Sequence, residues 1–563
     1  FQSIMSKDNN QSESAKLIAA AKVGDVPGVA AALKAGADKE AGDPERHNFR
    51  PLHWSAEKGH KDAVIKLLNM GVNVDAREDR GRSALHQVCF FGHEEVAKLL
   101  IGRGVVIDAV CKETSFTPLM AASQEGYENL VLLLLNAGAN IGLKEKGGKA
   151  SIHYAALMGQ NSVVKCLASN EADITLKDND EWQPIHSAAL NGHDMTVSTL
   201  IQLGADVNCV DKAKNTPLMA ASQNGHDEVV KILLENKALA DYKKSEGDTA
   251  LFLASEDGHT STAHMLITHG ACVDSAKCDG STPLIFASQN GRDELVSLYL
   301  LYGANVEAVM KNNGESSLLK ACEKGHLNTV NVLIDEGADL NRKTKNDVSS
   351  LWIASNKGHV DIVELLLQNG AQKNISNKSW QATHAAADEG HLNVLVKLKE
   401  YGCDLNATTN QNNSTPLHLA ITEGHTKVAE WLVVNGANLD VCDKDRNTPV
   451  QLAIKKGHSE LASFMRKPPS ERLQALSLDQ EASGSSNKSN SSPSGDSAPS
   501  FSAGATNLDC VVCMDPRTTT VMTLPCRHAV TCQKCMNDME ERGDNRCPLC
   551  RTDISQRIPI FIN

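Results

Sequence analysis

Residues Thr216–His226 read Thr-Pro-Leu-Met-Ala-Ala-Ser-Gln-Asn-Gly-His, and the fold can be inferred from this segment. A threonine hydroxyl is a good helix N-cap, and Pro217 suits the first turn, where its missing N–H costs nothing. Gly225 ends this short helix, because glycine readily adopts the left-handed conformation found at helix ends. Apolar residues then recur at helical spacing over residues 229–234, which predicts a second helix with one apolar face.

The same pattern recurs along most of the chain. Its first residue returns at intervals of 32 to 34 residues, and a degenerate unit over residues 15–25 precedes the series, which makes fourteen units. Self-similarity at a fixed period is the signature of a repeat protein. The units begin at Arg50, Ser83, Thr117, Ala150, Gln183, Thr216, Thr249, Thr282, Ser316, Ser349, Gln381, Thr415 and Thr448.

The period and the recurring residues resemble the ankyrin repeat, and the resemblance covers about residues 15–466. It implies a mostly α-helical fold in which helix pairs stack as a solenoid. Physical reasoning agrees, since one unit cannot bury its apolar face alone. Stacking of small residues also accounts for the composition, because the 563 residues are 41% apolar and only 4% aromatic.

Histidine occupies two recurring places in the units. One is the fourth position, as in His86, and the other follows the helix-ending glycine, as in His226. Because this register is fixed, we interpret these histidines as structural hydrogen-bonding residues rather than metal ligands or catalytic bases. The aromatic residues Trp182 and Trp380, each directly before a unit, are expected to brace turns.

Large apolar residues break the repeat pattern near the start of the array. The two positions before the helix-ending glycine are usually polar, as in Gln223-Asn224, but are aromatic or aliphatic in two early units. In ankyrin arrays these positions tend to face the binding groove, so we expect a substrate-binding patch there. The alternative is that the same side chains pack between neighbouring units. The residues of this patch are Trp54, Phe90, Phe91, Tyr154, Leu157 and Met158.

The period disappears over residues 467–507, which are rich in serine, glycine, asparagine and proline. Such a segment cannot bury enough apolar surface to offset the entropy of ordering, so we expect a disordered linker. Its serines leave open whether the linker is phosphorylated or simply solvated.

The C-terminal segment, residues 508–563, carries closely spaced cysteine and histidine pairs. Eight such residues make two tetrahedral sites of the kind that hold structural Zn²⁺, with no position left for a catalytic water. Because so short a segment has little apolar core, bound zinc is expected to stabilise its fold. The predicted ligands are Cys510, Cys513, Cys526, His528, Cys532, Cys535, Cys547 and Cys550.

The order of three cysteines, one histidine and four cysteines resembles the RING finger, a small α+β zinc-bound domain. That family's cross-brace implies one ion on Cys510, Cys513, Cys532 and Cys535, and a second on Cys526, His528, Cys547 and Cys550. By the same resemblance, an apolar surface of three residues binds a ubiquitin-charged E2 enzyme, and Arg551 bridges E2 and ubiquitin as the catalytic residue. The three apolar residues are Val512, Pro548 and Leu549.

The last residues, 557–563, are similar to those of the RINGs of inhibitor-of-apoptosis proteins and Mind bomb. The resemblance implies a terminal strand that forms a homodimer, with Phe561 touching ubiquitin across it. Arg527 departs from the glycine that those relatives often have before the histidine. An apolar terminal strand exposed in a monomer is also an aggregation hazard, which gives dimerisation a physical motive.

Together these features predict a RING-type E3 ubiquitin ligase whose ankyrin groove binds a protein substrate, an architecture similar to Mind bomb and plant ankyrin–RING ligases. The competing class is a noncatalytic scaffold whose RING mediates assembly only. The net charge of −13 falls almost entirely on residues 1–466 and opposes nucleic-acid or lipid binding. No apolar run predicts membrane insertion, so we expect a cytoplasmic location, with a nuclear one left open. Phe1–Ser3 are set aside, because Met5 is an alternative start.

Overall fold

A computed structural model describes the backbone of residues 2–374, 380–472, 520–524, 529–532 and 556–560. Side chains are described for residues 12–374 and 380–472. The chain divides into two compact units, Phe1–Cys272 and Val273–Asn563, and each is considered by itself. Among the described helices, none has a run long and apolar enough to cross a lipid bilayer.

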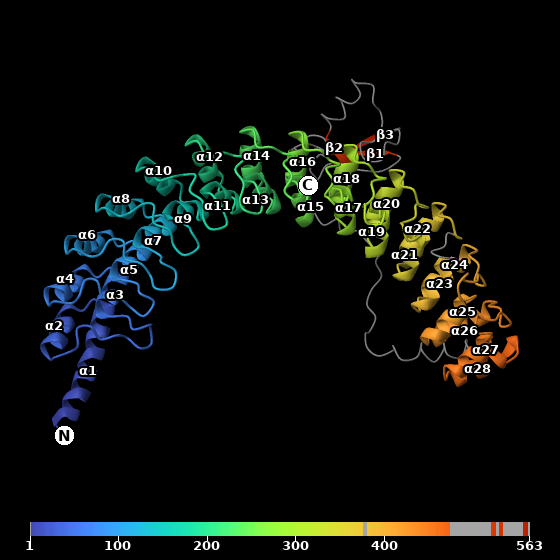
Figure 1. Cartoon of the computed structure of the whole chain (residues 1–563), viewed down its shortest axis with the longest axis horizontal. Coiled ribbons are helices and arrows are strands. Elements are labelled where there is room, and N and C mark those ends of the chain that lie inside the picture. Colours follow the sequence, from blue (N-terminus) through green and yellow to red (C-terminus); the bar gives the residue numbers. More distant parts are fainter. Residues whose placement is uncertain (1, 375–379, 473–519, 525–528, 533–555, 561–563) are drawn as a thin grey trace. The chain divides into compact units, whose positions relative to one another are not determined.

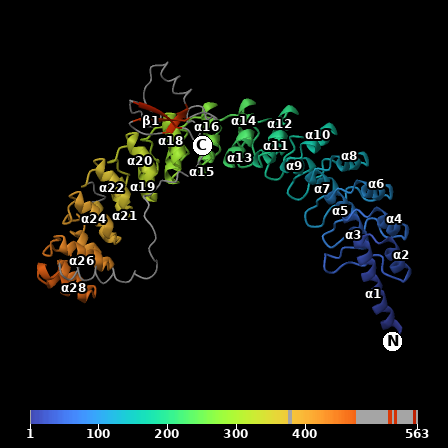
Figure 2. The same cartoon turned by 180° about the vertical axis from the view of Figure 1, so that it is seen from behind.

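The first unit is a row of helix pairs, one pair for each repeat. The first helices of successive pairs lie side by side, and the second helices form a parallel layer, as Figure 1 and the reverse view in Figure 2 both show. The described helices of this unit are α1 (Gln2–Val23), α2 (Val26–Lys34), α3 (Pro51–Glu57), α4 (Lys61–Asn69), α5 (Ala84–Phe91), α6 (Glu94–Gly102), α7 (Pro118–Glu125), α8 (Glu128–Asn136), α9 (Ser151–Leu157), α10 (Asn161–Ser169), α11 (Pro184–Leu190), α12 (Asp194–Gln202), α13 (Pro217–Gln223), α14 (Asp227–Glu235), α15 (Ala250–Asp257) and α16 (Thr260–Thr268).

Within itself, the second unit has the same two-layer arrangement of helix pairs. Its described helices are α17 (Pro283–Gln289), α18 (Asp293–Leu301), α19 (Ser317–Lys324), α20 (Leu327–Asp335), α21 (Ser350–Asn356), α22 (Val360–Gln368), α23 (Ala382–Asp388), α24 (Leu392–Glu400), α25 (Pro416–Glu423), α26 (Thr426–Val434), α27 (Pro449–Lys455) and α28 (Ser459–Arg466). The mostly α-helical repeat fold expected from the sequence is thereby confirmed.

Three strands are described in the C-terminal segment: β1 (Thr520–Leu524), β2 (Ala529–Cys532) and β3 (Gln556–Ile560). They form one antiparallel sheet in the order β2-β1-β3, with a register shift between Val521 and Met522 opposite β2. The terminal strand therefore pairs with β1 of the same chain and lies at an edge of the sheet. The linker, Arg527 and Phe561 lie outside the described residues.

Every predicted starting residue from Arg50 to Thr448 is the N-cap of the first helix of its pair. In the stretch quoted first, the Thr216 hydroxyl accepts a hydrogen bond from the Met219 N–H at 3.2 Å. The degenerate first unit differs from expectation, because α1 begins at Gln2 rather than near Ala15. No proline or glycine in residues 2–14 stops the helix earlier.

The apolar face predicted over residues 229–234 forms the core of its repeat. Val229, Val230 and Leu233 are at most 1% exposed, and Ile232 at the edge is half-buried. Small residues of the first helix, such as Ala221, are fully buried against neighbouring pairs. Stacking of neighbours thus buries the face that a single repeat would leave in water.

Most of the fourth-position histidines join their repeat to the next, as His86 illustrates. Its Nδ1 accepts the Ser83 backbone N–H at 3.1 Å, and its Nε2 lies 3.0 Å from the carbonyl oxygen of Phe116 in the following repeat. Because Nδ1 accepts a hydrogen bond, it carries no proton, and the single proton of the neutral ring is therefore on Nε2. Burial accordingly lowers the pKa of His86 to about 3 and that of His53 to about 4.

The histidines after glycine join repeats in the opposite direction. His226 Nε2 lies 2.9 Å from the Leu190 carbonyl oxygen of the preceding repeat. Gly192, with φ +74°, faces this ring, and a Cβ added there would come within 2.6 Å of His226 Nδ1. Both a left-handed backbone and a close approach require glycine here. The structural interpretation of both recurring histidines is confirmed.

Candidate functional site

Trp54, the first residue of the expected patch, is a packing residue in α3. Its side chain is 3% exposed, and its ring meets Phe49 edge to face with centroids 5.4 Å apart. The guanidinium of Arg46 lies 4.6 Å from the Trp54 ring centroid, and Lys22 Nζ lies 4.4 Å from it. The expectation that Trp54 faces a partner is corrected by this burial, because Phe49 and two cations from the preceding residues already contact its ring.

A row of three half-buried aromatic rings crosses neighbouring repeats. Phe90, near the end of α5, stacks on Phe116 with centroids 5.8 Å apart, and Phe116 meets Tyr154 of α9 edge to face at 5.0 Å. Each ring keeps part of its surface exposed. Burial raises the pKa of Tyr154 to about 12, so its hydroxyl stays a hydrogen-bond donor at neutral pH. Two expected patch residues are therefore joined through Phe116.

The remaining patch residues are more open. Phe91 is 47% exposed and Met158 is 49% exposed, whereas Leu157 is half-buried at the end of α9. Large apolar side chains with this much exposure contribute contact area when a partner covers them. Phe91 and Met158 thus stand at the surface as the sequence predicts.

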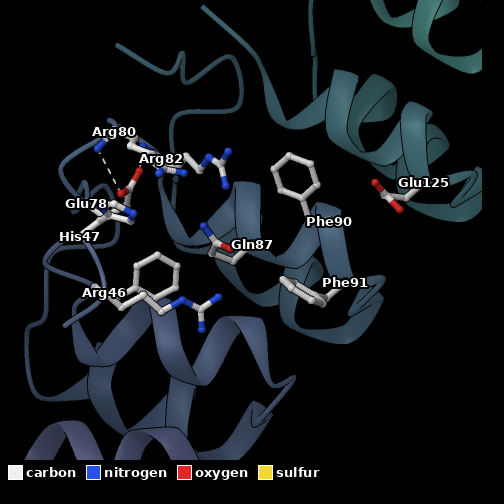
Figure 3. Close-up of a pocket in the computed structure, with 10 residues that line it drawn as sticks. Arg46, His47, Glu78, Arg80, Arg82, Gln87, Phe90, Phe91 and Glu125 are labelled. Carbon is white, nitrogen blue, oxygen red and sulfur yellow. Dashed lines mark hydrogen bonds between the residues drawn. The ribbon is translucent and has the colours of Figure 1, made fainter. Parts of the chain in front are cut away.

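Phe90 and Phe91 form one wall of a cavity of about 470 Å³. Figure 3 shows the opposite side, where Arg46 and Arg82 extend from the loops before α3 and α5 with Gln87 between them. Glu125, at the end of α7, closes the far side. Of the ten residues that line the cavity, seven are charged or polar and three are phenylalanines, so it is a mostly polar cavity with aromatic rings on its walls.

A second cavity of about 300 Å³ adjoins the first. Arg80, Arg82 and Phe90 line both, and the second adds Phe116 of the aromatic row and the exposed Glu113. The two cavities lie along the loops and first helices of successive repeats, where an extended segment of another protein can contact both.

A buried carboxylate shapes the loop that carries the arginines. Glu78 is 2% exposed, and its two oxygens accept the backbone N–H groups of Arg80 at 3.1 Å and Arg82 at 2.9 Å, drawn as dashed lines in Figure 3. The Arg82 guanidinium lies 5.2 Å from the centroid of the Phe90 ring. Glu78 thus orders the loop through its backbone, and the two guanidinium groups remain on the cavity wall.

Sequence reasoning missed Phe49, Phe116 and these arginines. The signal for the two phenylalanines was available, because each stands directly before a repeat, as Trp182 and Trp380 do. The rings of Phe49, Trp182 and Trp380 lie beside the histidine of the repeat that follows, with centroids 5.8 Å apart for Trp182 and His186, which agrees with the expected bracing of turns. For the arginines no signal existed, since lysines occur in many of the equivalent loops.

The predicted zinc-binding segment is described only in its strands. Cys532 is the last residue of β2 and pairs in register with Thr520 of β1. The other seven predicted ligands, Arg551 and the expected E2-binding residues Val512, Pro548 and Leu549 lie outside the described residues. The donor set of seven thiolates and one imidazole fits Zn²⁺, which prefers sulfur and nitrogen ligands. Within the described part of the chain, no cluster of three or more potential ligands could hold a metal ion.

Two family models match the chain. The model for ankyrin repeats in sets of three matches residues 52–145, 152–244, 236–310, 293–377, 318–409 and 383–471. The model for the zinc finger of C3HC4 type, the RING finger, matches residues 506–557. The second match falls on the segment that carries the predicted ligands, and its C3HC4 type implies zinc binding.

Individual relatives share shorter stretches. The B-cell lymphoma 3 protein homolog of Mus musculus is 31% identical over 116 residues, 20% of this chain and 26% of that protein. Neurogenic locus notch homolog protein 2 of Homo sapiens is 30% identical over 113 residues, 20% of this chain and 4% of that protein. The human ASB11 ankyrin repeat domain is 28% identical, with a TM-score of 0.37 over 40% of this chain and 99% of that domain. The chain belongs to the ankyrin-repeat family and carries a C-terminal RING-type zinc finger.

Proposed function

We propose that the protein is a RING-type E3 ubiquitin ligase, in which the ankyrin array binds a protein substrate and the RING binds a ubiquitin-charged E2. The observation that carries this proposal is the match of residues 506–557 to the C3HC4 RING finger in a chain that also holds an ankyrin array. RING modules of ligases bring a charged E2 to a substrate without forming a covalent intermediate.

In this mechanism the RING acts by positioning. Val512, Pro548 and Leu549 contact the E2, and Arg551 bridges E2 and ubiquitin so that the thioester is held in its reactive pose. Two structural Zn²⁺ ions, held by the eight predicted ligands, supply the fold of the segment and no chemistry of their own. The substrate lysine attacks the ubiquitin thioester carbonyl, ubiquitin is transferred from the E2 cysteine to the lysine nitrogen, and the E2 thiolate leaves.

The homodimer and the cellular location belong to the same proposal. The terminal residues around β3 join two RINGs, and Phe561 touches ubiquitin across the dimer. The edge position of β3 in the sheet is compatible with pairing to a second copy. A cytoplasmic location fits the acidic charge of the repeat region.

The test is a reconstituted reaction with the full chain, E1, a panel of E2 enzymes, ubiquitin and ATP. We expect ubiquitin chains to form on the protein itself, and Arg551→Ala to reduce their formation at least tenfold while zinc content stays the same. Arg517→Ala, an arginine of the same segment outside the ligand pattern, is the matched control. A zinc-loaded protein that discharges no E2 of the panel would instead favour the noncatalytic scaffold.

The substrate-binding role of the array has a separate test. The double variant Phe90→Glu with Phe91→Glu places two charges on the cavity wall and should weaken partner capture in pull-downs with the full chain as bait. Ubiquitin chain formation on the protein itself should not change. Full partner retention by the variant would remove this surface from the proposal and leave the RING assignment standing.

A further inference from the structure

Arg80 and Arg82 place two positive charges on the cavity wall, beside the single negative charge of the buried Glu78 carboxylate. Within the side chains that the structure describes, neither guanidinium forms an ion pair. The nearby Glu78 carboxylate is used by the backbone N–H groups of the same two residues. Arg46, on the same cavity wall, differs because it is held by Glu57 at 2.8 Å. Arg80 thus keeps its side-chain donors available for a ligand, whereas Arg82 also contacts the Phe90 ring and the Cys111 thiol and keeps only part of its donor set available.

The apolar side of the two cavities lies next to these donors. Phe90 is shared by both cavities, Phe91 is exposed in the first, and Phe116 extends the row into the second. Exposed Glu125 and Glu113 lie on the walls that face α7 and the preceding loop. The charge is therefore divided along the surface, with guanidinium groups at the α5 loop and carboxylates beyond the aromatic row.

The charges and aromatic rings of this surface favour a ligand of one chemical type. A guanidinium presents a planar fork of donors that matches a carboxylate, and such charge-assisted bonds are stronger than neutral ones. Aromatic walls bury an apolar side chain of the same ligand. A basic segment is disfavoured at the arginines, and an acidic one is disfavoured beside Glu125 and Glu113. The surface thus accepts a carboxylate at the loop and an apolar side chain beside it.

We propose that the two cavities bind an extended segment of the substrate in which acidic residues adjoin an aromatic or aliphatic residue. The acidic residues pair with Arg80 and Arg82, and the apolar residue packs against Phe90 and Phe91. This deepens the proposed function and rests on the array's role as substrate receptor. Binding of the segment is independent of ubiquitin transfer, so the two ideas fail separately.

The experiment measures binding of a short fluorescein-labelled peptide with glutamates flanking a phenylalanine and a leucine, using fluorescence anisotropy and the full chain. We expect Arg80→Gln with Arg82→Gln to weaken binding at least about tenfold, because each charge-assisted bond exceeds a neutral one. Raising the salt concentration should weaken binding to the original protein more than to the variant. Arg80→Glu with Arg82→Glu should weaken it further.

The matched control for Arg80→Glu with Arg82→Glu is Lys212→Glu with Lys214→Glu, which makes the same change in net charge in a later repeat loop of the same unit, where both lysines are exposed. Binding should be unchanged in this control, and both arginine variants should unfold at the temperature of the original protein. Equal binding of a peptide with lysines in place of glutamates, or unchanged binding by the arginine variants, would overturn the proposal.

Two other occupants have distinct outcomes. Competition by a synthetic copy of residues 473–483, which contains Asp479 and Glu481, would assign the surface to the chain itself and overturn the proposal. Loss of a dimer on Arg80→Glu with Arg82→Glu would assign it to a second copy, with the same consequence. Ubiquitin chain formation on the protein, measured in parallel, tests the RING alone and decides nothing about the peptide.

Discussion

Two repeats place different side chains at the same three positions, and the surfaces differ completely. In the repeat that begins at Ser83, the residue before the N-cap, the fifth residue and the eighth residue are Arg82, Gln87 and Phe90, which line an open cavity. In the repeat that begins at Ser316 they are Glu315, Lys320 and Glu323. There Lys320 forms ion pairs with Glu315 and, at 3.1 Å, with Glu323.

The comparison teaches that the repeat framework fixes where side chains stand, while their chemistry decides whether they serve the fold or a partner. Lys320 satisfies its charge inside the second unit, its side chain is only 14% exposed, and the two glutamates raise its pKa against the opposing effect of burial. Arg82 has no such carboxylate partner among the described residues. Side chains at equivalent positions of the repeat thus pair with one another in the second unit and line a solvent-accessible cavity in the first.

The largest expected difference between the two units is in their stability at low pH, where the first unit should lose more stability than the second. Burial lowers the pKa of His53, His86, His153 and His186 in the first unit, but only of His384 and His418 among the fourth-position histidines of the second. Since the unfolded histidine takes up a proton near pH 6.5 and the folded one does not, stability is complete above that pH and falls as the pH drops. For a pKa of about 4, the loss is about 3 kcal/mol per histidine.

Hydrogen exchange read repeat by repeat between pH 7 and pH 4 checks this expectation. Protection should fall more in the first unit than in the second. The variant His86→Gln offers a control, because Gln451 already occupies the same position in α27 and accepts the Thr448 N–H at 2.9 Å. It should flatten the acid response of its own repeat, and identical pH profiles for both units would contradict the account.

Placing the three residues of the Ser316 repeat at the equivalent positions of the Ser83 repeat should replace the cavity wall with an ion cluster. The variant Arg82→Glu with Gln87→Lys and Phe90→Glu copies the cluster of the second unit. We expect partner affinity to fall about 100-fold, because an aromatic contact and a cation are lost together. Pull-down or anisotropy with the full chain measures the loss, and thermal unfolding reports whether the fold is kept. Retained affinity would show that these positions do not determine recognition.

Removing the lysine from the ion cluster of the second unit should lower the stability of the fold and leave partner binding unchanged. Lys320→Ala leaves Glu315 and Glu323 facing each other in a half-buried site, and we expect a loss of about 2 kcal/mol in the free energy of unfolding. Urea denaturation followed by a probe in the second unit measures it. A double-mutant cycle with Glu323→Ala then isolates the pair, and additive effects in that cycle would argue against a coupled cluster.

The smallest effect on stability is expected for an exposed lysine that also pairs with two glutamates. Lys98 pairs with Glu94 at 2.7 Å and with Glu95 at 3.1 Å, but its side chain is 48% exposed. Because water screens exposed ion pairs, Lys98→Ala should not change the urea midpoint beyond error. A loss as large as that of Lys320→Ala would mean that burial does not set the strength of these clusters.

Prediction from sequence succeeded wherever a repeated local rule applies. Helix starts such as Thr216, the apolar face over residues 229–234 and the roles of His86 and His226 follow from capping, helical spacing and fixed register. It failed for Trp54, because an aromatic residue in the repeat pattern carries no sign of the neighbours that cover it. The start of α1 was also missed, since nothing local stops a helix upstream of Ala15.

The repeat architecture could be predicted from residues along the chain, and so could a donor set for zinc, because short-range periodicity and ligand spacing are properties of the chain alone. Which of the residues that break the repeat pattern reach the surface followed only from the folded structure. Phe116 joins Phe90 to Tyr154 from another repeat, and Glu78 keeps its carboxylate on backbone donors, so that Arg80 and Arg82 form no ion pair among the described residues. Exposure and charge pairing depend on residues about one repeat away, and those distances exist only once the repeats have stacked.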